Sequence, residues 1–145
     1  MLKNKFTWMA GIILVVIVIV ALLAREKVHR VTLLSNQSFS VASGDYKALS
    51  FKIDITDKKS NIIRGRVADR AGYGISFMVF DAKNFNAWKD RNPNTFSYVK
   101  EKNSKEVKFS FFPDHSDHYF FVFDNSYSIA KNKLPEVYAI WSYKK

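Results

Sequence analysis

The sequence predicts an all-β protein, an antiparallel β-sandwich of about eight short strands preceded by one transmembrane helix. Aromatic residues make up 16% of the 145 residues, with 13 Phe and 7 Tyr against 5 Gly and 3 Pro, and broad flat side chains suit a pleated, half-buried surface. Segments in which apolar and polar residues alternate recur along the chain, separated by turn-forming residues. One long apolar run stands before them, and a domain of about 115 residues cannot cover a helix that is apolar all round.

The apolar run, residues 6–24, reads FTWMAGIILVVIVIVALLA and contains no charged side chain. At about 1.5 Å per residue, a helix of this length is about 28 Å long, close to the thickness of the hydrocarbon core of a membrane. Lys3 and Lys5 precede the run, and Arg25 and Lys27 follow it. A short basic head before an apolar run is the layout of a signal anchor, which places the N-terminus in the cytoplasm.

Cleavage of this segment after Ala24 is the alternative. Leu22 disfavours it, because the position two before the cut residue is normally small. We therefore expect a single-pass protein of the cell membrane with its C-terminal domain outside. The expected parts are a cytoplasmic head at residues 1–5, the anchor at 6–24, a juxtamembrane linker at 25–36 and the sandwich at 37–145.

The strands after the anchor are of two kinds. Apolar and polar residues alternate in LSFKIDI, NIIRGRVADR and EVKFSFF, which predicts strands with one buried and one wet face. GISFMVFDA and DHYFFVFD are apolar at both odd and even positions, that is, on both faces of the strand, which predicts central strands. In order, the expected strands are residues 37–41, 49–55, 61–70, 74–82, 98–102, 106–112, 117–124 and 135–143, of which 37–41 and 98–102 have the weakest patterns. Turn signals lie between them at 42–45, 57–61, 70–74 and 113–117.

One segment, residues 83–96, does not fit a strand. Phe85 and Trp88 have the i, i+3 spacing of a helical turn, and Asn residues and Pro93 favour a loop after it. Phe85, Trp88, Lys89 and Arg91 could together grip a protein partner or a sugar. The competing interpretation, which we favour, is that the two aromatic side chains plug one open end of the sandwich.

A second candidate site lies where the strand in YFFVFDNSYS, residues 119–128, stops at a polar run. Asp124 and Asn125 could bind a ligand together with Ser128. They could equally satisfy the last backbone groups of a buried strand, and we favour this turn interpretation because Asp and Asn are common where chains turn.

The same region resembles the end of the Golgi-dynamics (GOLD) domain, a jelly-roll-like β-sandwich of membrane cargo receptors. Tyr119, Phe123 and Asn125 match the family pattern, whereas Asp117 replaces its glycine and Val122 its cysteine. The resemblance implies a GOLD-like sandwich. It does not extend to the trafficking role, because those receptors carry their membrane helix and sorting tail after the domain and this chain has its apolar run in front.

The net charge and the composition argue against a nucleic-acid-binding domain and against a metal site. The net charge is +10, and 18 basic and 12 acidic side chains remain after residue 30, without the cluster typical of a nucleic-acid domain. The chain has no Cys. His115 and His118 in DHSDH are possible metal ligands, but we favour a solvated turn.

No catalytic motif is present. We therefore expect no enzyme, no cofactor, no metal and no nucleic-acid partner. The favoured function is a membrane-anchored extracytoplasmic module that recognises another protein. The alternatives are a structural subunit of an envelope or secretion complex and a binder of carbohydrate or surface polymer that uses Trp88.

Overall fold

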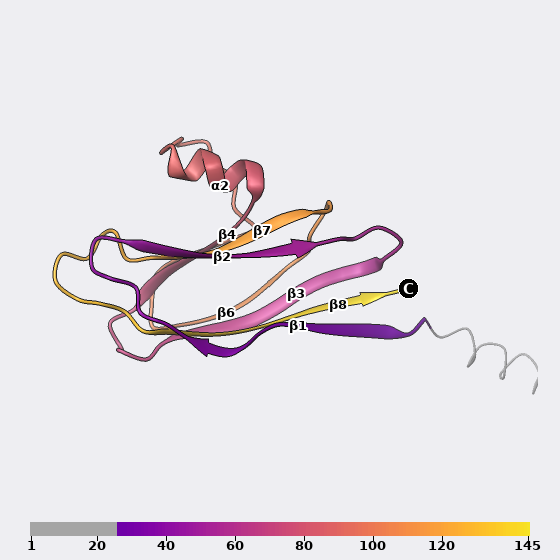
Figure 1. Ribbon diagram of the computed structural model, residues 1–145, viewed down its shortest axis with the longest axis horizontal. Helices are drawn as coiled ribbons and strands as arrows, with labels where there is room; N and C mark the ends of the chain where they lie inside the picture. The colour runs from indigo at the N-terminus through magenta and orange to yellow at the C-terminus, as the bar shows by residue number, and fades with distance from the viewer. Residues whose placement is uncertain (1–25) are drawn as a thin grey trace, which may run out of the picture.

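The computed structural model describes residues 26–145 as two four-stranded antiparallel sheets packed face to face (Figure 1). The β1 sheet has the order β1 (Val28–Ser38), β8 (Pro135–Lys144), β3 (Lys59–Asp69) and β6 (Glu106–Phe111). The β2 sheet has the order β2 (Tyr46–Ile53), β7 (Asp117–Asp124), β4 (Ile75–Asp81) and β5 (Val99–Ser104). One helix, α2 (Ala82–Lys89), follows β4. The predicted fold class, an all-β antiparallel sandwich of eight strands, is confirmed.

The core between the sheets is built mainly from aromatic side chains. On β6 and β7, alternate residues point inward, so that Phe109, Tyr119, Phe121 and Phe123 are buried in one cluster. The ring of Phe77 on β4 lies 4.9 Å from that of Phe109 and 5.3 Å from that of Phe123, measured between centroids. The aromatic bias of the composition therefore reflects the packing between the two sheets.

The strands β4 and β7 are apolar at both parities because both of their faces are covered. Their outward side chains form a second cluster with α2, which lies across the outer face of the β2 sheet (Figure 1). The buried members of this cluster are Met78, Phe80, Phe85 and Val122. The expected single helical turn is thus a helix of eight residues. It covers a sheet face and does not plug an open end of the sandwich, since the outward apolar residues of β4 and β7 need a partner there.

The sandwich starts earlier than the sequence suggested. Residues 28–36, expected as part of a linker, belong to β1, which pairs with β8 from Val28↔Lys144 onward. Only the first two residues of the expected strand 37–41 lie in β1, and Val41 forms an isolated bridge with Lys133. This edge strand has irregular pairing on either side of Leu34, and these irregularities break the period of two by which a strand is recognised in sequence.

The expected membrane anchor, residues 6–24, lies outside the described residues. Within residues 26–145, no helix is long and apolar enough to span a bilayer.

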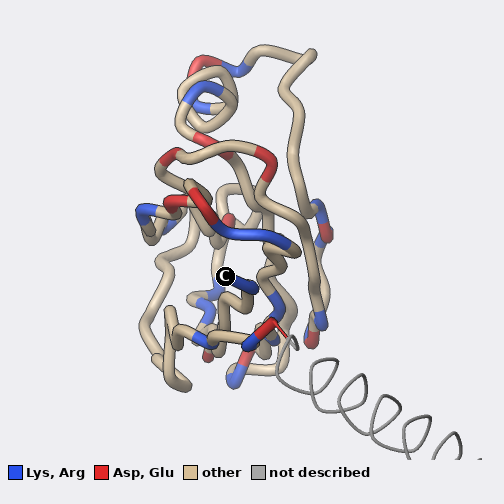
Figure 2. The backbone as a smooth tube through the Cα atoms, turned by 90° about the vertical axis from the view of Figure 1, so that its right-hand side faces the viewer, with Lys and Arg blue, Asp and Glu red and all other residues tan. Residues whose placement is uncertain are grey.

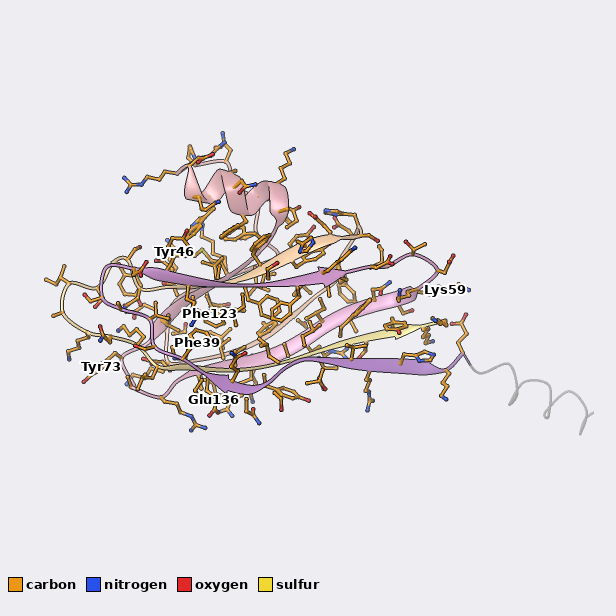
Figure 3. The ribbon with its side chains drawn as sticks, in the orientation of Figure 1. Phe39, Tyr46, Lys59, Tyr73, Phe123 and Glu136 are labelled. Atoms are coloured by element: carbon orange, nitrogen blue, oxygen red, sulfur yellow. The ribbon has the colours of Figure 1, made fainter. Side chains whose placement is uncertain are left out.

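The two ends of the sandwich differ. Val28, which follows residues 1–25 in the chain, pairs with Lys144 near the C-terminus at one end, on the right in Figure 1. The connections 39–45, 70–74 and 125–134 gather at the opposite end, which we call the loop end (Figure 1). Tyr46 and Tyr73 lie toward the loop end and Lys59 at the other (Figure 3).

Candidate binding site at the loop end

A pocket of about 420 Å³, here called the Trp88 pocket, lies between α2 and the edge of the β2 sheet near the loop end. It joins two stretches that are far apart in the sequence. Trp88, Lys89 and Arg91 come from the helix and the turn after it, and Asp124 comes from the end of β7. Four of the six predicted site residues are thereby brought together. The remaining lining residues are Gly44, Asp45, Tyr46 and Ser126.

Trp88 is held in place by the way α2 starts and by the rings around it. Asp81 caps the helix, with its side chain accepting a 2.7 Å hydrogen bond from the backbone N–H of Asn84. One helical turn before Trp88, the ring of Phe85 is 8% exposed and stacks on Phe120 at 4.2 Å. The ring of Tyr46 meets that of Trp88 edge to face at 4.9 Å. Trp88 and Tyr46 therefore form a rigid aromatic wall, whereas Phe85 lies beneath the surface and supports it.

The other walls of the pocket carry charges of both signs. Lys89 and Arg91 are exposed and line the pocket from α2 and the turn after it, whereas Asp45 and Asp124 line it from the start of β2 and the end of β7. Both carboxylates already accept backbone hydrogen bonds, Asp45 from Tyr46 N at 2.7 Å and Asp124 from Ser126 N at 2.9 Å. Among the described residues, none of these four groups forms an ion pair with another. The pocket can thus accept a ligand that carries both cationic and anionic groups.

Asn125 is the predicted site residue that the structure places farthest from the surface. It is 0% exposed, and its amide Nδ2 donates to the carbonyl oxygens of Val41, Ala42 and Lys131 at 3.3, 3.0 and 2.9 Å. Its backbone N–H donates to Asp45 O at 2.9 Å. Asn125 therefore fastens two loop-end connections together, while its neighbour Asp124 reaches the pocket. This arrangement supports the turn interpretation for Asn125.

Beside the pocket, the loop end exposes four large apolar side chains, here called the loop-end patch. Ile129 is 99% exposed, and Tyr73, Tyr127 and Leu134 are between 45% and 49% exposed. Asp124 lines both the Trp88 pocket and an adjacent hollow of about 330 Å³ that Tyr127 also lines. The Trp88 pocket thus continues, through Asp124 and this hollow, to Tyr127 of the patch.

Buried polar groups fix the loops that carry the patch. The carboxylate of Asp69, 6% exposed, accepts backbone hydrogen bonds of 2.8 to 3.2 Å from Ala71, Tyr73, Gly74 and Leu134. It therefore ties the connection after β3 to the one before β8. The hydroxyl of Tyr127 donates to Gly74 O at 3.2 Å, so its ring is held against the loop and does not swing freely.

The DHSDH turn lies at the other end of β7 and holds its histidines apart. His115 contacts Asp114 through Nδ1 at 2.7 Å, and its Nε2 lies 3.5 Å from Asp117 and 3.8 Å from Asp81. Partial burial lowers the pKa of His115, but the nearby carboxylates, Asp114 foremost, outweigh burial and raise the pKa above its usual value. His118 instead lies 3.3 Å from Ser50 Oγ. The two histidines therefore serve different partners.

Sequence reasoning missed four of the eight residues that line the Trp88 pocket, and all four residues of the loop-end patch. Asp45 and Tyr46 enter the pocket from the start of β2, which is paired with the end of β7 through Tyr46↔Asp124. A signal for the loop-end patch was present, since Tyr73, Tyr127 and Ile129 are large apolar residues inside turn segments. A turn offers no strand face on which to bury such residues.

No protein-family model and no curated protein sequence matches this chain. Solved structures with a similar arrangement include the pre-peptidase C-terminal domain of a Bacillus anthracis collagenase, with 12% identity, 79% of this chain and 88% of that chain covered, and a TM-score of 0.40. PliG of Aeromonas hydrophila, a periplasmic inhibitor of g-type lysozyme, has 7% identity, 83% and 89% coverage and a TM-score of 0.42.

A mutant of the carbohydrate-binding module CBM29-2 has 9% identity, 80% and 86% coverage and a TM-score of 0.44. None of these three structures is a GOLD domain, and the GOLD resemblance stays a prediction. Similarities of this size say nothing about what the present chain binds.

Proposed function

We propose that this chain is a membrane-anchored extracytoplasmic module that recognises another protein through the Trp88 pocket and the loop-end patch. Recognition is its whole role in this proposal, without a catalytic step. The observation that carries the proposal is the exposure of Ile129, Tyr127, Tyr73 and Leu134 on loops that buried hydrogen bonds hold in place.

The composition of this surface favours a protein as the ligand. Tyr and Trp are enriched among the residues that dominate protein–protein binding energy, and they lose little conformational entropy on binding. Trp88 and Tyr46 line the pocket, and Tyr73 and Tyr127 lie in the patch. The opposed charges of Lys89 and Asp124 suit a peptide segment, which presents side chains of both signs.

The position of the surface agrees with an anchor at residues 6–24. Val28, which follows that segment in sequence, lies at the end of the sandwich opposite the loop end (Figure 1). If residues 6–24 span the membrane, Val28 and Lys144 face the bilayer and the loop end points away from it. A partner outside the cell then reaches Ile129 and the Trp88 pocket without approaching the bilayer.

Site-specific crosslinking tests the recognition surface. A photoreactive residue at Ile129 in the full-length, membrane-embedded chain is expected to capture a protein partner, and Ile129→Asp is expected to weaken copurification of that partner about tenfold or more. Phe112, 68% exposed just after the end of β6, is the matched control, and Phe112→Asp is expected to leave copurification unchanged.

Crosslinks from position 112 that equal those from 129, or none from 129, would contradict the proposal. The identity of the captured species also separates two roles. Partners that change with conditions indicate a recognition module, whereas one partner at fixed stoichiometry indicates a subunit of a permanent assembly.

A protease test checks the anchor and its orientation. Protease added to intact cells is expected to digest the domain after residue 30, and release of the undigested chain from membranes is expected to require detergent. Release by carbonate or high salt alone would rule out the anchor. Digestion only after cell lysis would place the domain in the cytoplasm.

A further inference from the structure

The outer face of the β1 sheet carries a groove of about 640 Å³. None of the described helices covers this face, because α2 lies on the other sheet (Figure 1). The groove crosses all four strands of the sheet. Its lining includes Arg30 from β1, Tyr138 and Ile140 from β8, Arg64 and Arg66 from β3, and Lys108 from β6.

The charge in this groove is of one sign. Among the residues that the structure describes, four cationic side chains line it and no carboxylate does. Arg66 is partly neutralised, since its Nε lies 3.0 Å from the carboxylate of Glu106 beyond the groove. Arg30, Arg64 and Lys108 form no ion pair within residues 26–145. Lys and Arg also occur on α2 and elsewhere on both sheets (Figure 2), so their presence alone does not distinguish the groove. What distinguishes it is that no carboxylate of the described residues lines it beside these cations.

The strand pattern and register produce this clustering. On β3, the residues Ile63, Gly65 and Val67 point into the core, which turns Arg64 and Arg66 outward. Gly65 is required between them, because a Cβ there would lie 2.3 Å from the carbonyl oxygen of Tyr138 and 2.5 Å from the ring of Phe109.

In the neighbouring strands, Arg64 pairs with Ile140 on β8, and Arg66 pairs with Tyr138 on β8 and with Lys108 on β6. Antiparallel partners share a face of the sheet. The cations are therefore placed beside apolar side chains on one surface.

The groove also has the groups that sugar rings contact. Tyr138 is 37% exposed and, together with Ile140, gives the floor an apolar surface. Ser110 and Ser142 line the same groove and add hydroxyl groups that can donate and accept hydrogen bonds. An apolar surface with a few polar groups around it is typical of small-molecule and sugar sites.

We propose that this groove binds a linear acidic polysaccharide, with its carboxylate or sulfate groups on Arg30, Arg64 and Lys108 and a sugar ring on Tyr138. The cations lie on β1, β3 and β6, which span about 14 Å at about 4.8 Å between strands, so one extended chain can reach all of them.

The shape of the surface favours a polysaccharide chain over a lipid bilayer. A flat bilayer contacts side chains that protrude from a protein, whereas the cationic side chains here line a hollow. A single-stranded nucleic acid is disfavoured too, since such sites use several aromatic platforms. Phe109 also lines the groove but is only 7% exposed, so among the described residues Tyr138 alone offers an exposed aromatic side chain there.

This inference is independent of the proposed function. The Trp88 pocket lies on the β2 sheet and the groove on the β1 sheet, and the two share no lining residue. Failure of either proposal leaves the other in place.

Binding of defined oligosaccharides tests the groove. The full-length chain, held in discs of neutral lipid, is titrated with fluorescent oligogalacturonate and with heparin oligosaccharides, and neutral dextran serves as the uncharged probe. We expect saturable binding of an acidic probe and none of dextran.

The double variant Arg64→Ala/Lys108→Ala is expected to bind about tenfold or more weakly, with the salt dependence of log K reduced by about 1 to 2. The matched control is Lys52→Ala/Lys83→Ala, which removes two exposed cations outside the groove and is expected to change affinity less than twofold.

The Tyr138 variant and competing ligands identify which class of molecule the groove binds. Tyr138→Ala is expected to weaken oligosaccharide binding several-fold and to leave any weak binding of duplex DNA unchanged.

The proposal is overturned if neither acidic probe binds, if dextran binds equally, or if both double variants lose affinity alike. It is also overturned if duplex DNA, or vesicles of phosphatidylcholine with phosphatidylglycerol, compete as well as the oligosaccharide at equal charge.

Discussion

Phe121→Ala is expected to lower the free energy of unfolding by about 3 to 5 kcal/mol. Phe121 is 0% exposed on β7, and its ring contacts those of Phe51, Phe77, Phe109 and Phe111 at centroid distances of 5.1 to 6.3 Å. Removing this ring leaves a cavity between the two sheets that rigid aromatic neighbours cannot fill. Denaturant unfolding of the full-length chain in a neutral detergent, followed by Trp fluorescence, measures the loss.

A matched control separates this effect from a general loss of aromatic content. Phe112→Ala removes the same group from a side chain that is 68% exposed and is expected to change stability by no more than about 0.5 kcal/mol. A domain of this size has a total stability of about 5 to 15 kcal/mol, so the two variants are readily told apart. A cost below about 1 kcal/mol for Phe121→Ala would show that this ring is not in the core.

Substitutions at Asn125 are expected to have the next largest effect. Asn125→Ala removes the donor that serves the carbonyl groups of Val41, Ala42 and Lys131 and is expected to cost about 1 to 3 kcal/mol. Asn125→Asp has nearly the same shape but turns a carboxylate toward these oxygens at a fully buried position. It is expected to cost about 3 to 5 kcal/mol at neutral pH, because an uncompensated charge is left in the interior.

The Asp variant should also make stability depend on pH. Burial and the facing carbonyl oxygens raise the pKa of the new carboxyl group above its value in the unfolded chain. The folded state therefore binds a proton more readily than the unfolded state, and stability is lost as pH rises through the folded pKa. Thermal unfolding between about pH 4 and pH 8 is expected to show the two Asn125 variants converging at the acid end.

Asn94 supplies the control for this series, since it is exposed and its side chain makes no hydrogen bond within residues 26–145. Asn94→Ala and Asn94→Asp are expected to unfold as the unmodified chain does. In the Asn125 variants, partner capture at Ile129 is expected to fall only as far as the folded fraction falls. An Asn125→Ala chain that unfolds normally but captures no partner would assign Asn125 to the binding site and contradict its role in fastening the loops.

The sequence by itself determined the fold class and the buried face of most strands. The alternation in residues 49–55 and 106–112 reflects a local physical rule, because successive side chains of a strand point to opposite faces whatever the strand pairs with. The apolar residues at odd and even positions of β4 and β7 likewise identified the two central strands of the β2 sheet, since a strand buried on both faces has no wet side. The sequence predicted only residues 37 and 38 of the edge strand β1, because its irregular pairing with β8 interrupts the two-residue period.

The tertiary structure alone decided which of these segments meet. Trp88 and Asp124 line one pocket because α2 packs across the β2 sheet and the end of β7 lies at its edge. Arg30, Arg64 and Lys108 share one groove because β1 and β6 flank the β8–β3 pair in the order β1-β8-β3-β6. The order of strands in a sheet is set by long-range pairing and by the packing of whole faces, and residue periodicity along one segment carries no information about it.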